Sequence, residues 1–173
     1  IYEAYGYTTQ EAVASIINKN LYGLDIDERA AQLSYFAVMM KACQYDKRFL
    51  RRKDENGQPK VPQPSVYAVQ ESNDVDRYVL AYFCNGNEEL KEAMDTIVEE
   101  LHDAKEYGSI ITVTQQDWDA LYARFEEIKE DISFHKEDAL QLLPLVRVAQ
   151  TLAQKYDVVV TNPPYMGASN MNE

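Results

Sequence analysis

The feature that most constrains the fold is a short apolar run, residues 158–160, which a Pro-Pro pair follows closely. Three consecutive valines without polar alternation predict a strand buried on both faces, as in a parallel sheet. Pro163 and Pro164 lack the N–H groups that a hydrogen-bond ladder needs, so the chain must leave the sheet at Asn162. In open parallel sheets, ligands bind beyond the carboxyl ends of the strands. We therefore expect Asn162, the two prolines and Tyr165 to lie at a catalytic or ligand-binding site.

Residues 160–165, Val-Thr-Asn-Pro-Pro-Tyr, resemble the catalytic loop of amino-group methyltransferases that use S-adenosylmethionine (SAM), above all the DNA adenine-N6 class. The resemblance implies that the Asn162 side-chain oxygen and the Pro163 carbonyl accept hydrogen bonds from the target amine and direct its lone pair at the methyl group. It also implies that Pro164 keeps this loop rigid and that Tyr165 stacks on a flipped-out base. The alternative is an ordinary strand exit, because Asn-Pro is a common turn signal.

A second part of the resemblance lies near the start of the chain. Residues 20–27 predict a short strand with an acidic end, and Asp27 is a favourable N-cap for a mostly apolar helix at 28–42, expected to be buried against the sheet. In nucleotide-binding sheets, an acid at such a strand end accepts hydrogen bonds from ribose hydroxyls. Similarity to the family implies that Asp25 binds the SAM ribose and that Ile26 lies against the adenine ring. The alternative for Asp25 is a solvated loop acid.

A third part of the resemblance covers residues 132–140, which we expect to return to the sheet because Ile132 and Phe134 alternate with polar neighbours. In the family, an acid that ends such a strand accepts a hydrogen bond from the adenine amino group of SAM. The resemblance assigns this role to Asp138, with Ala139 beside it. The alternative is an acidic strand end without a ligand.

The predicted fold class is α/β, a partial Rossmann-like SAM-methyltransferase sheet with an inserted α-helical hairpin. We expect residues 1–173 to form one partial catalytic domain. Two amphipathic helices, near 88–105 and 115–129, indicate a mainly helical insertion at about 70–131, because a minimal methyltransferase core does not need them. Near the start of the chain, Thr8 and a glutamate three residues later predict a capping box for a helix at 8–18.

The six glycines are scattered and form no glycine-rich loop of the kind that lets a backbone approach SAM. In the family, that turn comes before a helix like the one at 8–18, so we expect it upstream of Ile1. We expect the later strands downstream of Glu173 and weak or no SAM binding by these residues alone. The resemblance is greatest to the large adenine methyltransferases of bacterial phage defence, a group with BREX-type PglX proteins and fused type II restriction-modification enzymes. It implies defence-system subunits as partners.

The formal net charge of −12 opposes independent binding of this chain to a polyanion. Double-stranded DNA is therefore expected to be bound through regions outside these residues. A basic run at 47–53 is the one positive cluster, and it is either a solvated face or a loop that contacts phosphates.

Two distant cysteines and two isolated histidines fit no metal-ligand spacing, and the free thiols suit a reducing cytoplasm. No apolar run approaches the roughly 20 residues of a membrane span. Two further functions remain open. One is a methyltransferase acting on a glutamine amide or an RNA guanine amine, which use a similar loop. The other is a non-catalytic interaction module with an acidic helical surface.

Overall fold

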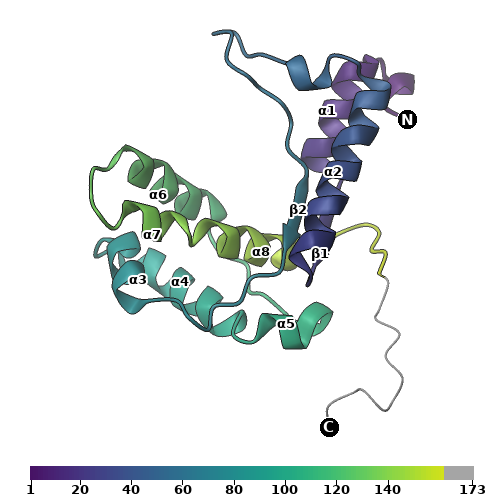
Figure 1. Ribbon diagram of the computed structural model, residues 1–173. Coiled ribbons are helices and arrows are strands. Elements are labelled where there is room, and N and C mark those ends of the chain that lie inside the picture. Colours follow the sequence, from purple (N-terminus) through teal and green to yellow (C-terminus); the bar gives the residue numbers. More distant parts are fainter. Residues whose placement is uncertain (162–173) are drawn as a thin grey trace, which may run out of the picture.

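The computed structural model describes residues 1–161 (Figure 1). Within them, two parallel strands, β1 (Tyr22–Asp25) and β2 (Ser65–Ala68), pair from Tyr22 opposite Ser65 to Asp25 opposite Ala68. Helix α2 (Glu28–Tyr45) belongs to the crossover between them, since parallel neighbours cannot be joined by a tight turn. The other elements are η1 (Tyr2–Tyr5), α1 (Thr9–Lys19), η2 (Phe49–Arg51), α3 (Arg77–Cys84), α4 (Glu88–Glu100), α5 (Ala104–Tyr107), η3 (Gly108–Ile110), α6 (Trp118–Glu130), α7 (Lys136–Leu140) and α8 (Leu143–Ala153).

Helices cover both faces of the strand pair. Leu24 and Tyr67 pack against the core cluster that includes α8. Because side chains alternate along a strand, Gly23 and Val66 lie on the opposite face, and α2 contacts both strands there. Figure 1 shows α2 and α8 on opposite sides of β2. The chain is thus an α/β protein with a helix–sheet–helix arrangement, as the predicted fold class requires at this coarse level.

Side-chain caps fix where the first two long helices begin. The Thr8 hydroxyl accepts a hydrogen bond from the Glu11 N–H at 3.2 Å, and the Glu11 carboxylate accepts one from the Thr8 N–H at 2.9 Å, which confirms the capping box. Asp27 caps α2 by accepting a hydrogen bond from the Ala30 N–H at 2.9 Å, as expected.

The burial expected for α2 is wrong within the described residues. Only Ala31 and Ala42 of this helix are buried, whereas Leu33 and Phe36 remain 69% and 59% exposed. The cause is geometric, because two short strands and α1 can cover only one side of a helix of 18 residues.

A helical part follows β2 and has its own tightly packed centre. The expected pair of amphipathic helices is confirmed as α4 and α6, although α4 already ends at Glu100. The rings of Phe83 and Phe125 lie 4.7 Å apart, and both side chains are fully or almost fully buried. Trp118 is also buried in this core, as its place in the apolar stripe of α6 indicates. Since Val69 after β2 belongs to the same cluster, the helical part and the sheet share one core.

The strand expected within residues 132–140 does not form. Ile132 and Phe134 are each 99% exposed, and α7 begins at Lys136. The Asp131 carboxylate accepts hydrogen bonds from the N–H groups of Ile132 and Ser133, at 2.7 and 3.2 Å. Local side-chain acceptors therefore take the backbone donors that a strand would use in a ladder. An alternation of only two apolar residues was too short to indicate a sheet.

The strand expected at 158–160 is also absent. Val158, Val159 and Val160 are 78%, 75% and 91% exposed, with no strand pairing. A strand needs a neighbour to bond its backbone and cover its side chains. Within residues 1–161, only β1 and β2 are strands, and each is paired with the other.

Asp46 and Arg52 make the most buried ion pair described in residues 1–161. The Asp46 carboxylate is 1% exposed and accepts hydrogen bonds from the Arg52 guanidinium at 2.8 Å and from the Arg48 N–H at 2.9 Å. Burial raises the pKa of Asp46, but the hydrogen bonds from Arg52 and Arg48 and the positive charges of both residues lower it by more, so its pKa lies below the usual range.

We expect this carboxylate to make stability pH-dependent in the acid range. Because its folded-state pKa is depressed, its contribution is fully present above the unfolded value of about 3.9 and is lost as pH falls through the folded value. Asp46→Asn should lower the free energy of unfolding by about 1–3 kcal/mol at neutral pH. Urea unfolding at neutral pH and near pH 2.5 should show the wild type and variant converging in acid. A constant difference would contradict this assignment.

Candidate functional site at the carboxyl edge of the sheet

Asp25 lies where the sequence places it, at the carboxyl end of β1. The Asp27 N–H donates to Asp25 Oδ1 at 2.9 Å, which turns the chain sharply into α2. The Val69 N–H donates to the Asp25 carbonyl at 2.8 Å, so the backbone there stays tied to the second strand. The Asp25 side chain is exposed, and its Oδ2 has no hydrogen-bond donor within residues 1–161. This oxygen can accept a hydrogen bond from a ligand hydroxyl.

Ile26 follows on the same edge and is 48% exposed. Gly108 lies next to it, because a Cβ added to that glycine would stand 3.6 Å from Ile26 Cδ1. Its φ of +55° also favours glycine. The segment formed by α5 and η3 therefore approaches the carboxyl edge beside Ile26. From sequence, Gly108 marks only the end of a helix, so this approach could not be predicted.

Long-range hydrogen bonds hold α5 at the end of β2. The Glu71 carboxylate accepts from the Lys105 N–H at 3.1 Å. Asn73 and Asp103 bond reciprocally, with the Asn73 amide donating to the Asp103 carboxylate at 2.6 Å and the Asp103 N–H donating back at 2.9 Å. Polar residues directly after β2 thus form a second part of the edge. The signal for them in the sequence is the polar run at residues 70–74, which follows β2.

Asp138 and Ala139 do not reach this edge. Both lie in α7, which packs against α3 and α6, and Ala139 is fully buried in the helical core. Helix α8 separates α7 from β2 in Figure 1. The strand expected to carry Asp138 to the sheet is therefore wrong, because residues 132–140 form a loop and a short helix.

Residues 162–165, the catalytic candidates, lie outside the described residues, but the chain leading to them is anchored. The rings of Tyr156 and Tyr22 lie 5.2 Å apart, and the Tyr156 hydroxyl donates to the Thr151 carbonyl at 2.7 Å. Burial, together with nearby Tyr22 and Tyr67, raises the pKa of Tyr156 to about 12. Since Tyr22 begins β1, Tyr156 stands at the amino end of that strand.

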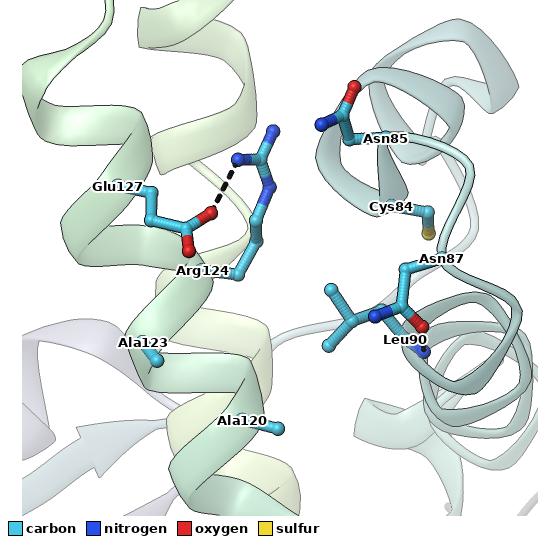
Figure 2. A pocket seen from close by; sticks show the side chains of 8 residues that line it. All are labelled: Cys84, Asn85, Asn87, Leu90, Ala120, Ala123, Arg124 and Glu127. Atoms are coloured by element: carbon cyan, nitrogen blue, oxygen red, sulfur yellow. Dashed lines mark hydrogen bonds and ion pairs between the residues drawn. The ribbon is translucent and has the colours of Figure 1, made fainter.

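A hollow of about 220 Å³ lies elsewhere, between the α3–α4 corner and α6 (Figure 2). Its one guanidinium, Arg124, is already engaged, because it donates to the carbonyls of Tyr82 and Phe83 at 3.3 and 2.7 Å and pairs with Glu127. These carbonyls lie in the last turn of α3, so Arg124 stabilises a helix end. Burial raises the pKa of the Cys84 thiol, which makes it a poor nucleophile. The hollow therefore offers structural contacts rather than chemistry.

Residues 1–161 contain no group of three or more His, Cys, Asp or Glu placed to bind a metal ion. In that same range, no helix is both long and apolar enough to cross a bilayer.

An acid at the carboxyl end of a strand in a parallel βαβ unit is the arrangement of α/β nucleotide-binding proteins. The chain belongs to the Eco57I restriction-modification methylase family, whose model matches residues 19–173.

Two curated relatives are similar to nearly the whole chain. It is 38% identical to the adenine-specific methyltransferase BrxX of Escherichia coli O9:H4 (strain HS) over 191 aligned positions, which cover 99% of the chain and 16% of that protein. It is 32% identical to the adenine-specific methyltransferase PglX of Lacticaseibacillus casei (strain Zhang), with 99% of the chain and 14% of that protein covered. The chain thus spans about a sixth of the length of these relatives.

Proposed function

We propose that this chain supplies the central part of a SAM-dependent DNA adenine-N6 methyltransferase with a Rossmann-like sheet. The observation that carries the proposal is that Asp25 and Tyr156 lie at opposite ends of one strand. Asp25 ends β1, and Tyr156 lies against Tyr22 at its beginning. Residues 157–161, if extended, span about 17 Å, which exceeds the length of a four-residue strand. In the described structure residues 158–160 are exposed and unpaired. Pairing of this segment beside β1 would bring Asn162 from the amino end of that strand to the edge where Asp25 lies.

In this proposal, the residues of the chain bind and orient both reactants. SAM supplies the electrophilic methyl group. Asp25 accepts hydrogen bonds from the ribose hydroxyls, and Ile26 lies against the adenine ring of the cofactor. Asn162 and the Pro163 carbonyl accept hydrogen bonds from the target amino group, which frees its lone pair for attack. Pro164 fixes the loop, and Tyr165 stacks on the flipped base.

The names of the two relatives favour a base amine over the alternatives as the methyl acceptor. Both are called adenine-specific methyltransferases, which supports adenine rather than a glutamine amide or an RNA guanine amine as the acceptor. Double-stranded DNA is the proposed substrate, and a cytoplasmic role in restriction-modification or phage defence follows from the resemblance. The direct test is to incubate the full-length protein with SAM and duplex DNA, RNA or protein, and to identify the methylated product by mass spectrometry. Methylation of RNA or protein alone would overturn the proposal.

Asp25→Asn should weaken SAM binding about tenfold to a hundredfold in the full-length protein. The charged acceptor contributes about 1.5–3 kcal/mol through its hydrogen bonds, whereas the amide keeps Oδ1 available for the turn. Calorimetric titration with SAM measures the effect without any methyl transfer. The matched control is Asp27→Asn, which makes the same charge change two residues away and keeps an equally good helix cap. Equal losses in both variants would show that Asp25 acts only through charge or folding.

A further inference from the structure

The strongest charged feature outside the candidate site lies between α2 and β2. Residues 46–60, here called the basic hairpin, contain six of the 17 Lys and Arg residues of the chain but only three of its 29 Asp and Glu residues. Five of these cations are exposed and take no part in the ion pairs described for residues 1–161: Lys47, Arg48, Arg51, Lys53 and Lys60. A positive surface of this kind is unusual in a chain with a net charge of −12.

The basic hairpin is firmly attached to the α1–α2 pair. Phe49 is fully buried in a cluster with residues of both helices. The Arg52 guanidinium donates to the Asp46 carboxylate at 2.8 Å and to the Gln10 carbonyl at 2.6 Å. The sixth cation is therefore used to fix the base of the hairpin, and the other five are presented on an ordered support. Such a support reduces the conformational entropy lost on binding.

Backbone and side-chain hydrogen bonds also define the tip of the hairpin. Lys53 forms an antiparallel bridge with Pro59, and the Lys60 N–H donates to the Arg52 carbonyl at 2.9 Å. The Asp54 carboxylate accepts from two backbone N–H groups, at 2.9 and 2.8 Å, and so closes the turn. Glu55 is the other carboxylate at the tip. The five exposed cations therefore outweigh the two acids around them.

The basic hairpin lies at the opposite end of α2 from the candidate site (Figure 1). Helix α2 has 18 residues, starts beside Asp27 at the carboxyl edge and ends at Tyr45. At 1.5 Å per residue it spans about 27 Å. This distance corresponds to about eight base pairs of B-form DNA. The hairpin is thus too far from the reacting base to touch it, but it is within reach of the duplex that flanks it.

We propose that the basic hairpin binds the phosphate backbone of duplex DNA beside the target base. The choice of DNA as the polyanion rests on the proposed function, whereas the cationic surface stands on the structure alone. Lysine and arginine contacts to phosphates carry no sequence information, so the hairpin holds the duplex without reading it. The hairpin also allows an acidic chain to bind DNA, because the local electrostatic potential near five exposed cations is positive although the net charge is negative.

The test compares two triple variants of the full-length protein that carry the same change in net charge. The first is Lys47→Gln, Lys53→Gln and Lys60→Gln in the hairpin. The control is Lys19→Gln, Lys91→Gln and Lys129→Gln on α1, α4 and α6. Fluorescence anisotropy measures binding to a duplex of about 30 base pairs at several salt concentrations. The duplex contains only G·C pairs, so it offers no adenine, and no SAM is added.

The hairpin variant should bind the duplex roughly tenfold to a hundredfold more weakly at low salt. In a plot of log affinity against log salt concentration, the slope of the hairpin variant should be less steep by about 2.7, the value for three lost phosphate contacts. The control should stay within about twofold of the wild type. Equal losses in the two variants, or an unchanged slope in the hairpin variant, would overturn the proposal. Because the duplex lacks adenine, this result is independent of the methylation assay, so either proposal can fail while the other stands.

Discussion

Asn162→Ala is expected to reduce the rate of adenine methylation by about 10²–10³-fold while leaving SAM affinity within about twofold of the wild type. The loss follows from removing one aligned hydrogen-bonding group that acts on the reacting amine, an effect of about 2.7–4 kcal/mol for comparable groups in other enzymes. Single-turnover transfer of a labelled methyl group from SAM to duplex DNA measures the chemical step, and calorimetric titration measures cofactor binding.

Two further substitutions make the Asn162 test specific. Asn162→Asp keeps side-chain acceptors at the same place, so its rate should lie between those of the wild type and the alanine variant. Asn18→Ala, on the exposed face of α1, should leave the rate unchanged. A rate for Asn162→Ala above a tenth of the wild-type value would favour a purely structural Pro-Pro turn.

Contacts between residues that are close in the chain could be predicted from the sequence. The capping box of Thr8 and Glu11 and the cap at Asp27 need only a side chain and an N–H three residues away. The position of Asp25 at a strand end was predicted from two patterns together, a short apolar segment and the capped helix that follows it. These features are determined within one turn or strand, so pattern and propensity were sufficient to predict them.

Features that depend on distant partners could not be read in the same way. The runs at 132–134 and 158–160 have the apolar residues of strands, but a strand exists only where another one pairs with it. The same limit explains why α5 was not expected at the carboxyl edge. Asn73 and Asp103 form hydrogen bonds with each other although 30 positions separate them, and neither local sequence indicates the partner residue. The part of the candidate site beside β2 was therefore visible only in three dimensions.

Phe125→Ala is expected to destabilise the protein by about 3–5 kcal/mol, the range for removing a buried aromatic ring. Phe125 is 1% exposed and packs on Phe83, in the core cluster that also contains Val69 after β2. Because the helical part and the sheet share this core, the loss should not stay within the helices. Hydrogen-exchange mass spectrometry of the full-length protein should show lower protection in peptides from both α6 and β2.

A matched control exists in the same chain, because Phe134 is 99% exposed. Phe134→Ala removes the same side chain and should change stability by no more than about 0.5 kcal/mol. If Phe125→Ala lowers protection in α6 while β2 is unaffected, residues 70–131 fold as a unit of their own. Loss in both places instead means that this segment supports the strand that lies beside Asp25. Under the proposed function, changes in the helical core would then weaken SAM binding without altering any residue of the candidate site.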